Sequence, residues 1–278
     1  MERYLDIDPW RVVETGFHPD RQRSSESIFS IGNGRFGQRA NHEETFTGDH
    51  LKGSYVGGVY YPDKTKVGWW KNGYPEYFAK VLNAPDWTSI EVKVNGEILD
   101  LNVQNVRAFR RVLDMKIGVL TRSFEVDMGE IVLSVKAQRF CSMADVETAH
   151  IRYAVDVLAG EAKVQVSGAL NGDVHNEDAN WDEGFWETEA CKGDGHGGLL
   201  VVSTRKTGFH VGHAIEGAMS CDGKPLEGRL IVGKQGLSVS FEAQVEAGQT
   251  LVFEKAIGLV RGLDHPHSEL GFRARDKA

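Results

Sequence analysis

Apolar and polar residues alternate most clearly between residues 89 and 103, which read SIEVKVNGEILDLNV. Every second residue from Ile90 to Val94 is apolar, which is typical of a strand with one buried face. Asn95 and Gly96 follow, and both tolerate the positive φ angles that a type I′ turn requires. The segment therefore predicts a β-hairpin with its apolar side chains on one face. The expected pairs are Val94 with Glu97, Val92 with Leu99 and Ile90 with Leu101.

The same two-residue period recurs along the chain in short runs that end at Gly, Asn or Asp. No segment keeps apolar residues at the i, i+3, i+4, i+7 spacing of a sustained amphipathic helix. These runs predict roughly 15 strands. Parallel neighbours need crossover connections, usually helices, so strands without such helices must be mostly antiparallel. A single open sheet of so many strands would curl or split, so we expect two packed sheets. We therefore expect an all-β fold, a large antiparallel two-sheet sandwich. The clearest runs are 118–126, 131–140, 150–158, 162–170, 198–206, 208–220, 228–233, 237–245 and 250–260.

Composition narrows the class of protein. Hydrophobic residues make up 41% of the 278, enough for a sizeable core, and the net charge of −8 argues against a protein that coats nucleic acid. No apolar run approaches the ~18 residues that cross a membrane, and the first residues, MERYLDIDPWRVVE, lack the apolar stretch of a secretory signal. Three widely spaced cysteines are typical of reduced thiols. We expect a cytoplasmic protein that binds no nucleic acid, membrane, metal or cofactor.

Three segments depart from the strand pattern, namely 32–44, 60–87 and 171–191, and we expect the last two to be ordered loops. Gly32, Gly34 and Gly37 match the GxGxxG pattern of dinucleotide-binding loops. That motif opens a helix within a βαβ unit, whereas the residues after Gly37 do not have the pattern of an amphipathic helix. We interpret the glycines as residues that permit tight turns between strands.

Residues 173–189, DVHNEDANWDEGFWETE, combine seven acids with three aromatic rings and contain no Lys or Arg. Carboxylates can bond sugar hydroxyls, and flat rings can stack on the C–H faces of a sugar. The same residues suit a protein docking loop, because aromatic side chains anchor interfaces. A solvated acidic loop is the third interpretation, although two tryptophans in one such loop argue against it. The acids are Asp173, Glu177, Asp178, Asp182, Glu183, Glu187 and Glu189, and the rings are Trp181, Phe185 and Trp186.

A calcium site in this segment is not expected. Four potential ligands have the spacing of an EF-hand loop, but Glu183 stands where the sharp turn needs glycine. The sequence also predicts no helices on either side of the segment, as an EF-hand would require. The four residues are Asp178, Asn180, Asp182 and Glu189.

The ten histidines could include a catalytic base, but none lies in an HExxH, GxSxG or Cys/His pattern. His210 and His213 are three residues apart in a strand-like run, so they are expected to face opposite sides. A glycosidase needs two carboxylates placed across a glycosidic bond, and spacing singles out no such pair among 40 acids. The histidines nearest to acids or strands are His42, His150, His175, His210 and His213.

Four long segments, 24–44, 53–87, 109–124 and 171–186, resemble in order the N-terminal domain of glycoside hydrolase family 65. That family contains maltose, trehalose and kojibiose phosphorylases, and the stretch NEDANWDEGFW is most similar to the maltose phosphorylase branch. The resemblance implies a galactose mutarotase-like β super-sandwich over residues 1–264. It also implies that residues 265–278 begin a linker to an (α/α)6 catalytic barrel that this chain lacks.

In that family the barrel carries the general acid and the phosphate site, so the resemblance assigns no catalytic residue here. It implies the non-catalytic domain of an inverting phosphorylase that cleaves an α-linked glucose disaccharide such as maltose with phosphate. The domain would pack on the barrel, shape its cleft and support a homodimer of the full-length enzyme, and alone it would be inactive. The alternative is a stand-alone carbohydrate-binding or mutarotase-like protein, which would need a Glu base and a His acid on a concave sheet face.

Two sets of residues are predicted to serve these roles. Adjacent tryptophans in an extended run cannot both point inward, so one would face water unless a partner covers it. We therefore expect Trp69, Trp70 and Lys71 at a domain or dimer interface, with burial of both rings under the sandwich's own loops as the alternative. The acidic segment is expected to project from one end of the sandwich toward the cleft. Its carbohydrate-cleft candidates are Asp178, Asn180, Trp181, Asp182 and Trp186.

Overall fold

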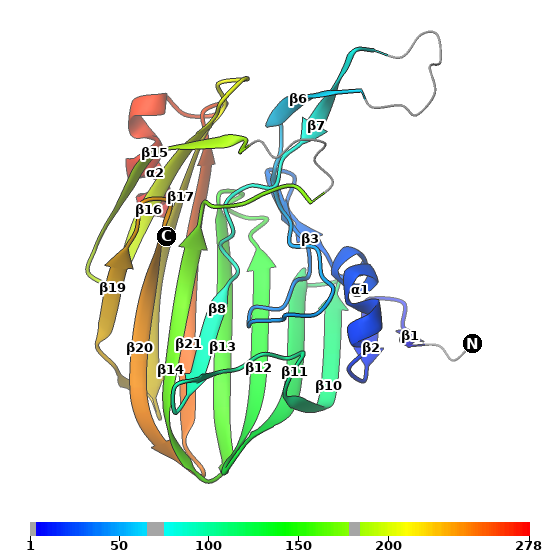
Figure 1. The fold of residues 1–278 in the computed structure, drawn as a ribbon, viewed down its shortest axis with the longest axis vertical. Helices are drawn as coiled ribbons and strands as arrows, with labels where there is room; N and C mark the ends of the chain where they lie inside the picture. Colours follow the sequence, from blue (N-terminus) through cyan, green and yellow to red (C-terminus); the bar gives the residue numbers. More distant parts are fainter. Residues whose placement is uncertain (1–3, 66–74, 178–183) are drawn as a thin grey trace.

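The structure is a computed structural model and describes residues 4–65, 75–177 and 184–278. Two large antiparallel sheets lie face to face along their long strands, which confirms the predicted all-β sandwich (Figure 1). The larger sheet has the order β1-β2-β10-β11-β12-β13-β21-β17-β16-β15, with β18 paired to β17. Its strands are β1 (Leu5–Ile7), β2 (Arg11–Thr15), β10 (Asn105–Asp114), β11 (Val119–Met128), β12 (Ile131–Cys141), β13 (Thr148–Ala159), β15 (Trp186–Asp194), β16 (Gly197–Thr204), β17 (His210–Cys221), β18 (Lys224–Pro225) and β21 (Thr250–Arg261).

The second sheet, in the order β19-β20-β14-β8-β9, closes the sandwich. Alternate residues of its long strands are buried, so one face of the sheet packs on the core and the other meets water. Phe241 of β20 and Phe253 of β21 meet across the two layers with ring centroids 5.8 Å apart. The strands are β8 (Ile90–Val94), β9 (Glu97–Ile98), β14 (Glu161–Asn171), β19 (Gly228–Val232) and β20 (Gly236–Glu246).

The predicted hairpin is the turn between β8 and β9. Asn95 and Gly96 have φ angles of 50° and 88°, as a type I′ turn requires, and Val94 pairs with Glu97. The Leu99 N–H donates to the Val92 carbonyl at 2.9 Å, so the second expected pair is also confirmed.

The third expected pair is wrong, because β9 ends at Ile98. The N–H of Leu101 donates to the Thr45 carbonyl at 3.1 Å, and the N–H of Ile90 donates to the Glu43 carbonyl at 2.7 Å. The segment around residue 44 therefore lies beside the hairpin and takes the hydrogen bonds that a longer β9 would have made.

Two small sheets are present in addition to the two large ones. Strands β3 (Ile31–Gly32), β4 (Phe36–Gln38) and β5 (Ser54–Val56) form one, and β6 (Tyr60–Lys64) and β7 (Tyr77–Val81) form the other. The β6–β7 pair projects from one end of the sandwich (Figure 1). The expectation that 60–87 and 171–191 are loops throughout is thus corrected, since β6, β7 and the start of β15 lie within them. Most of β7 is exposed and β15 is an edge strand, so neither shows the alternation of a half-buried strand.

The glycines of the GxGxxG match permit a tight turn, as predicted. Gly32 of β3 pairs with Gly37 of β4, and Gly34 has a φ angle of 85° between the two strands. A Cβ on Gly32 would lie 3.0 Å from the Phe36 carbonyl oxygen, so a side chain there would be tightly packed against the neighbouring strand.

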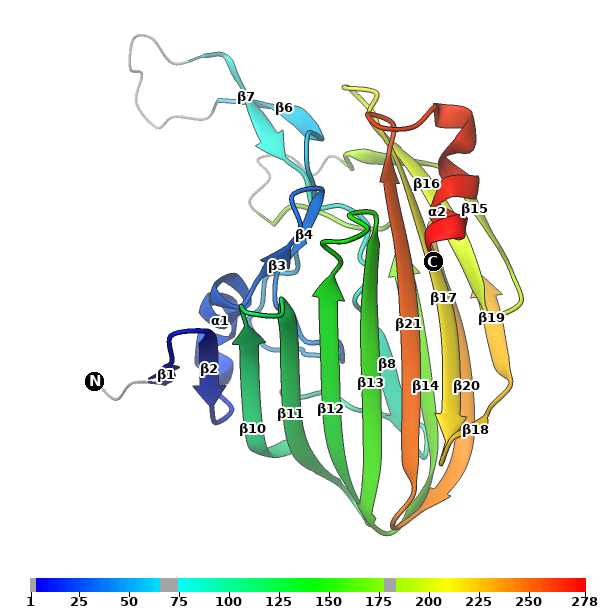
Figure 2. The same ribbon diagram turned by 180° about the vertical axis from the view of Figure 1, so that it is seen from behind.

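Two short helices are present among the described residues, and neither is the sustained amphipathic helix that the sequence was expected to lack. Helix α1 (Gln22–Ile28) follows the 3-10 turn η1 (Pro19–Arg21), and helix α2 (Leu270–Lys277) follows η2 (His267–Glu269). Both are shorter than the window in which helical periodicity can be recognised. Helix α2 buries Leu270 and Ala274 on β16, β17 and β21, so the segment predicted to begin a linker packs on the sheet here (Figure 2).

The inner face of β10, β11 and β12 carries three buried arginines, Arg111, Arg122 and Arg139. Arg122 contacts both Glu43 and Glu44, which come from the N-terminal segment that covers this half of the sheet. Arg139 Nη1 lies 3.2 Å from a Glu43 carboxylate oxygen. Opposite charges therefore fill this region of the core, between apolar side chains of the same strands.

No helix in the described ranges is long and apolar enough to cross a membrane. The three cysteines, Cys141, Cys191 and Cys221, are free thiols, as the sequence predicted.

Candidate functional site

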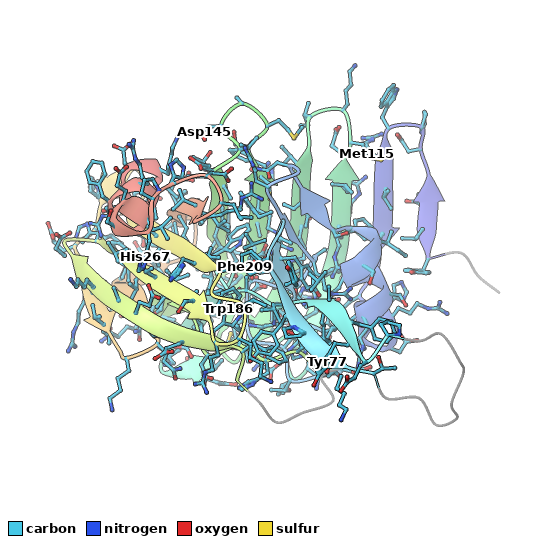
Figure 3. The ribbon with its side chains drawn as sticks, turned by 90° about the horizontal axis from the view of Figure 1, so that it is seen from above. Tyr77, Met115, Asp145, Trp186, Phe209 and His267 are labelled. Atoms are coloured by element: carbon cyan, nitrogen blue, oxygen red, sulfur yellow. The ribbon has the colours of Figure 1, made fainter. Side chains whose placement is uncertain are left out.

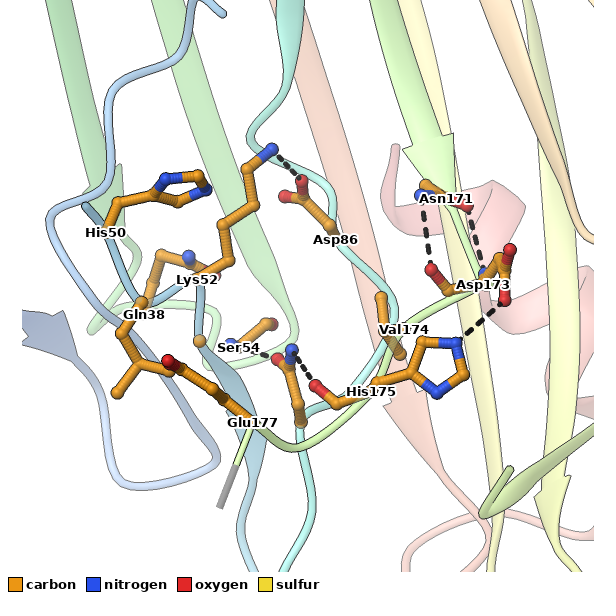
Figure 4. Close-up of a pocket in the computed structure, with 13 residues that line it drawn as sticks. Gln38, His50, Lys52, Ser54, Asp86, Asn171, Asp173, Val174, His175 and Glu177 are labelled. Carbon is orange, nitrogen blue, oxygen red and sulfur yellow. Dashed lines mark hydrogen bonds and ion pairs between the residues drawn. The ribbon is translucent and has the colours of Figure 1, made fainter. Parts of the chain in front are cut away.

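A polar pocket of about 270 Å³ opens at one end of the sandwich (Figure 4). Gln38 and three separate segments line it, at residues 50–54, 83–86 and 171–177, and the last of these contains the start of the acidic stretch singled out in the sequence. A second pocket of about 380 Å³ shares part of this lining. The polar residues of the first pocket are Gln38, His50, Lys52, Ser54, Asn83, Asp86, Asn171, Asp173, His175 and Glu177.

Asn83 joins these segments. Its side-chain carbonyl accepts a hydrogen bond from the Ser54 N–H at 2.9 Å, and its side-chain amide donates to the His175 carbonyl at 3.1 Å. Its backbone N–H donates to the Asn176 side-chain oxygen at 2.8 Å. One buried asparagine therefore fixes the acidic stretch against the loop that leads from β7 to β8.

The chain is anchored on both sides of positions 178–183. Glu177 accepts two hydrogen bonds from the Arg23 guanidinium of α1, each of 3.0 Å, in the bidentate arrangement that is strongest for this pair. On the other side, Phe185 is buried, and the Trp186 indole N–H donates to the Asn83 carbonyl at 2.8 Å. The ends of the stretch are thus held beside the pocket by opposite elements of the fold.

Asp86 supplies a fixed negative charge to the pocket. Burial by itself raises the pKa of the carboxyl, but Lys52 at 3.2 Å and the hydroxyls of Ser89 and Thr88 outweigh it and hold the pKa well below its usual range. The carboxylate is therefore ionised at neutral pH and accepts hydrogen bonds. It can bind a polar ligand, but it cannot serve as the proton donor that cleavage of a glycosidic bond needs.

Most of the predicted site residues fall outside the described residues, so their roles stay predictions. These are the cleft candidates Asp178, Asn180, Trp181 and Asp182 and the interface candidates Trp69, Trp70 and Lys71. Trp186 is described and lies in the core with 6% of its surface exposed. Its ring holds one end of the stretch in place, and its direct contact with a carbohydrate stays a prediction.

The candidate histidines lie in different environments. His210 is half-buried and His213 is fully buried, which confirms that the two face opposite sides of β17. Burial lowers the pKa of His213 to about 3. His42 and the neighbouring Glu43 are also buried, so they offer no open acid–base pair on the concave face of the sheet. His175 alone among the five lines the polar pocket.

Sequence analysis missed His50, Lys52, Asn83 and Asp86, which the fold brings to the pocket. Asn83 and Asp86 stand in the stretch NAPDW, where Asn, Pro and Asp are most simply interpreted as turn residues. Their separation from residues 171–177 left no local signal that they share a pocket.

The fold is that of a solved phosphorylase domain. A structure described as a putative kojibiose phosphorylase from human microbiome matches 99% of this chain with a TM-score of 0.87 at 23% identity, over 36% of its own length. A family model described as "Glycosyl hydrolase family 65, N-terminal domain" matches residues 12–278. The chain therefore belongs to glycosyl hydrolase family 65, as its resemblance predicted, and its residues 12–278 match the N-terminal domain of that family.

Curated relatives agree with this assignment. Maltose phosphorylase of Bacillus subtilis (strain 168) is 41% identical over 208 residues, which cover 75% of this chain and 28% of that protein. Alpha,alpha-trehalose phosphorylase of Thermoanaerobacter brockii is 28% identical over 281 residues, which cover 95% of this chain and 36% of that protein. The chain thus spans about a third of the length of these relatives.

Proposed function

We propose that this chain is the non-catalytic N-terminal domain of an inverting disaccharide phosphorylase. The observation that carries the proposal is the family match over residues 12–278. The relatives named as maltose and trehalose phosphorylases, of which this domain covers 28% and 36%, support phosphorolysis of an α-linked glucose disaccharide such as maltose. The remaining part of such an enzyme would supply the general acid and bind phosphate in place of a second carboxylate.

In this proposal the acidic stretch shapes the approach to the cleft. On either side of residues 178–183, Glu177 accepts hydrogen bonds from Arg23 and the buried Trp186 donates one to Asn83, and these contacts support the proposal. Asn180 and Trp181 would then contact the sugar, with the ring stacked on a C–H face. Neighbouring carboxylates would bond hydroxyls of the sugar or arginines of the catalytic barrel.

The β6–β7 hairpin is the proposed contact with the barrel or with a second subunit. Tyr77 and Val81 are 51% and 55% exposed on it, although apolar side chains of this size are usually covered. Trp69, Trp70 and Lys71 lie between its two strands in the sequence, and in this proposal they take part in the same contact. Free thiols at all three cysteines support a cytoplasmic enzyme.

Kinetics of the full-length phosphorylase test the cleft. Trp181→Ala is expected to raise KM for the disaccharide about tenfold, the effect of losing roughly 1.4 kcal/mol of binding free energy. Trp10→Ala is the matched control, because Trp10 is 59% exposed and directly precedes strand β2, which lies between β1 and β10 in the large sheet. A Trp181→Ala enzyme with the KM and kcat of the wild type would leave the acidic stretch as a solvated loop.

A further inference from the structure

A bulge in edge strand β15 directs an acidic side chain toward the C-terminal segment. Thr188 pairs with Val202 and Ala190 with Val201, so Glu189 is the extra residue and has no partner in the ladder. Bulges of this kind re-aim a side chain and are frequent beside functional sites. The stretch that carries Glu189 was singled out by its acids, but the pocket at the end of the sandwich does not include this residue.

Two histidines from other elements meet the Glu189 carboxylate. His210, at the start of β17, places Nε2 3.1 Å from Oε1, and His267, in η2, places Nε2 2.6 Å from Oε2. The two imidazole rings lie 4.0 Å apart between centroids, and one ligand atom from each of the three residues lies within 4.8 Å of the others. Figure 3 shows His267 beside the strands of this edge of the sheet.

The surroundings suit an ion that enters from water. The three side chains are 26%, 29% and 58% exposed for Glu189, His210 and His267, so the group is open on one side. The Ser203 hydroxyl also bonds the Glu189 carboxylate, as an outer partner that orients a ligand would.

We propose that Glu189, His210 and His267 bind a divalent transition-metal ion of the Zn²⁺ class. Imidazole nitrogens and a carboxylate are preferred ligands of such ions, whereas Mg²⁺ and Ca²⁺ prefer oxygen ligands alone. Two histidines and one carboxylate leave at least one coordination position for water or an external ligand.

The ion would fasten the C-terminal segment to the sandwich. His267 directly precedes α2, and the other two ligands belong to the sheet on which α2 packs. The remaining polar contacts of α2 are surface ion pairs, such as Arg275–Asp194 and Lys277–Asp145, which contribute little in water. A metal link would therefore hold the segment that in the relatives precedes the rest of the enzyme.

Titration of the metal-free, tag-free chain with ZnCl₂ in a calorimeter tests the site. One ion per chain is expected, and Ser203→Ala should weaken binding about tenfold, with larger losses for Glu189→Gln and His267→Asn. The matched control is His150→Asn, because His150 forms a single exposed pair with Glu254 at 2.6 Å. Co²⁺ bound to the wild type should show the visible absorption of a cobalt ion with nitrogen and oxygen ligands. This measurement requires no variant.

Absence of binding at sub-millimolar Zn²⁺, or binding that Glu189→Gln and His267→Asn leave unchanged, would overturn the proposal.

Amide hydrogen exchange tests directly whether the ion holds α2 on the sheet. Zn²⁺ should slow exchange in residues 270–277 of the wild type and leave it unchanged in His267→Asn. Equal exchange rates with and without bound Zn²⁺ would refute the metal link between helix and sheet.

Discussion

Buried ionisable side chains distinguish this core at the scale of single residues. His213 is fully buried on β17, and both of its ring nitrogens lack a hydrogen-bond partner among the described residues. Lys255 is also fully buried between the sheets, where its Nζ donates to the carbonyls of Ala169 and Ser89. Burial lowers the pKa of the Lys255 ammonium to about 7. Such groups cost free energy when charged, so they make stability depend on pH.

His213 is expected to destabilise the domain in mild acid. Its pKa of about 3 in the folded state lies below the ordinary value of about 6.5, so between these values the unfolded chain binds a proton that the folded chain does not. Stability is therefore lost as the pH falls through 6.5 toward 3, on the order of 2 kcal/mol at about pH 5. In the wild type, the free energy of unfolding in urea should be lower at about pH 5 than at about pH 7.5. In His213→Leu this decrease should be smaller by about 2 kcal/mol. Equal differences for the variant and the wild type would contradict the assignment.

At the scale of elements, the backbone of helix α2 packs closely against two glycines of the large sheet. A Cβ on Gly258 of β21 would lie 2.0 Å from the Ala274 carbonyl oxygen of α2, and one on Gly212 of β17 would lie 2.8 Å from the Leu270 carbonyl oxygen. These two glycines let the helix backbone rest directly on the sheet. The eight residues of α2 are too few for a stable isolated helix, so this contact decides whether the helix forms.

Gly258→Ala is therefore expected to displace α2 and to destabilise the domain by roughly 1–3 kcal/mol, the usual cost of overpacking. Trypsin should then cleave after Arg273 and Arg275 faster than in the wild type. Gly37→Ala is the control, because its Cβ would meet only the Ile31 carbonyl oxygen at 3.6 Å, an ordinary contact. Cleavage rates that are the same in Gly258→Ala and the wild type would show that α2 does not depend on this approach.

At the scale of the whole molecule, the two sheets enclose the hydrophobic core, and polar loops lie together at one end of the sandwich. The polar pocket, the two anchored ends of the acidic stretch and the β6–β7 hairpin all belong to that end (Figure 1). Its pocket holds an ionised aspartate rather than a carboxylic acid that could donate a proton. This ionised aspartate agrees with the proposed non-catalytic role of the domain.

The isolated chain is expected to release no glucose 1-phosphate from maltose, trehalose or kojibiose in phosphate buffer. Catalysis needs a correctly placed acid and phosphate, and such positioning is worth many powers of ten in rate. The assay compares the purified chain with the full-length enzyme and with a preparation from cells that carry the empty vector. Product above the empty-vector level would contradict a non-catalytic role.

The hairpin surface is expected to hold the assembled enzyme together. Replacement of residues 66–74 by a Gly/Ser segment of equal length removes Trp69, Trp70 and Lys71 and keeps β6 and β7. If the full-length enzyme forms the proposed dimer, light scattering after gel filtration should show that it dissociates; if the surface contacts the proposed barrel instead, hydrogen exchange should show the domain released from it. An unchanged mass and unchanged exchange would exclude this surface as the interface.

The sequence alone determined the features that depend on neighbouring residues. Asn95-Gly96 between alternating runs predicted the β8–β9 turn, because both the turn angles and the strand faces are local properties. Alternation over the long strands predicted the two-sheet sandwich, and the spacing of His210 and His213 predicted their opposite faces. Four segments in order also sufficed to predict the family.

Only the tertiary structure decided which distant residues meet. Asn83 and His175 share a pocket because separate loops pack at one end, and Glu189, His210 and His267 converge because a bulge, a strand start and a C-terminal turn lie side by side. Strands β6 and β7 and helix α2 were missed because exposed or very short elements carry no periodic pattern. Contacts between residues far apart in the chain depend on the packing of whole elements, and no local pattern of side chains encodes that packing.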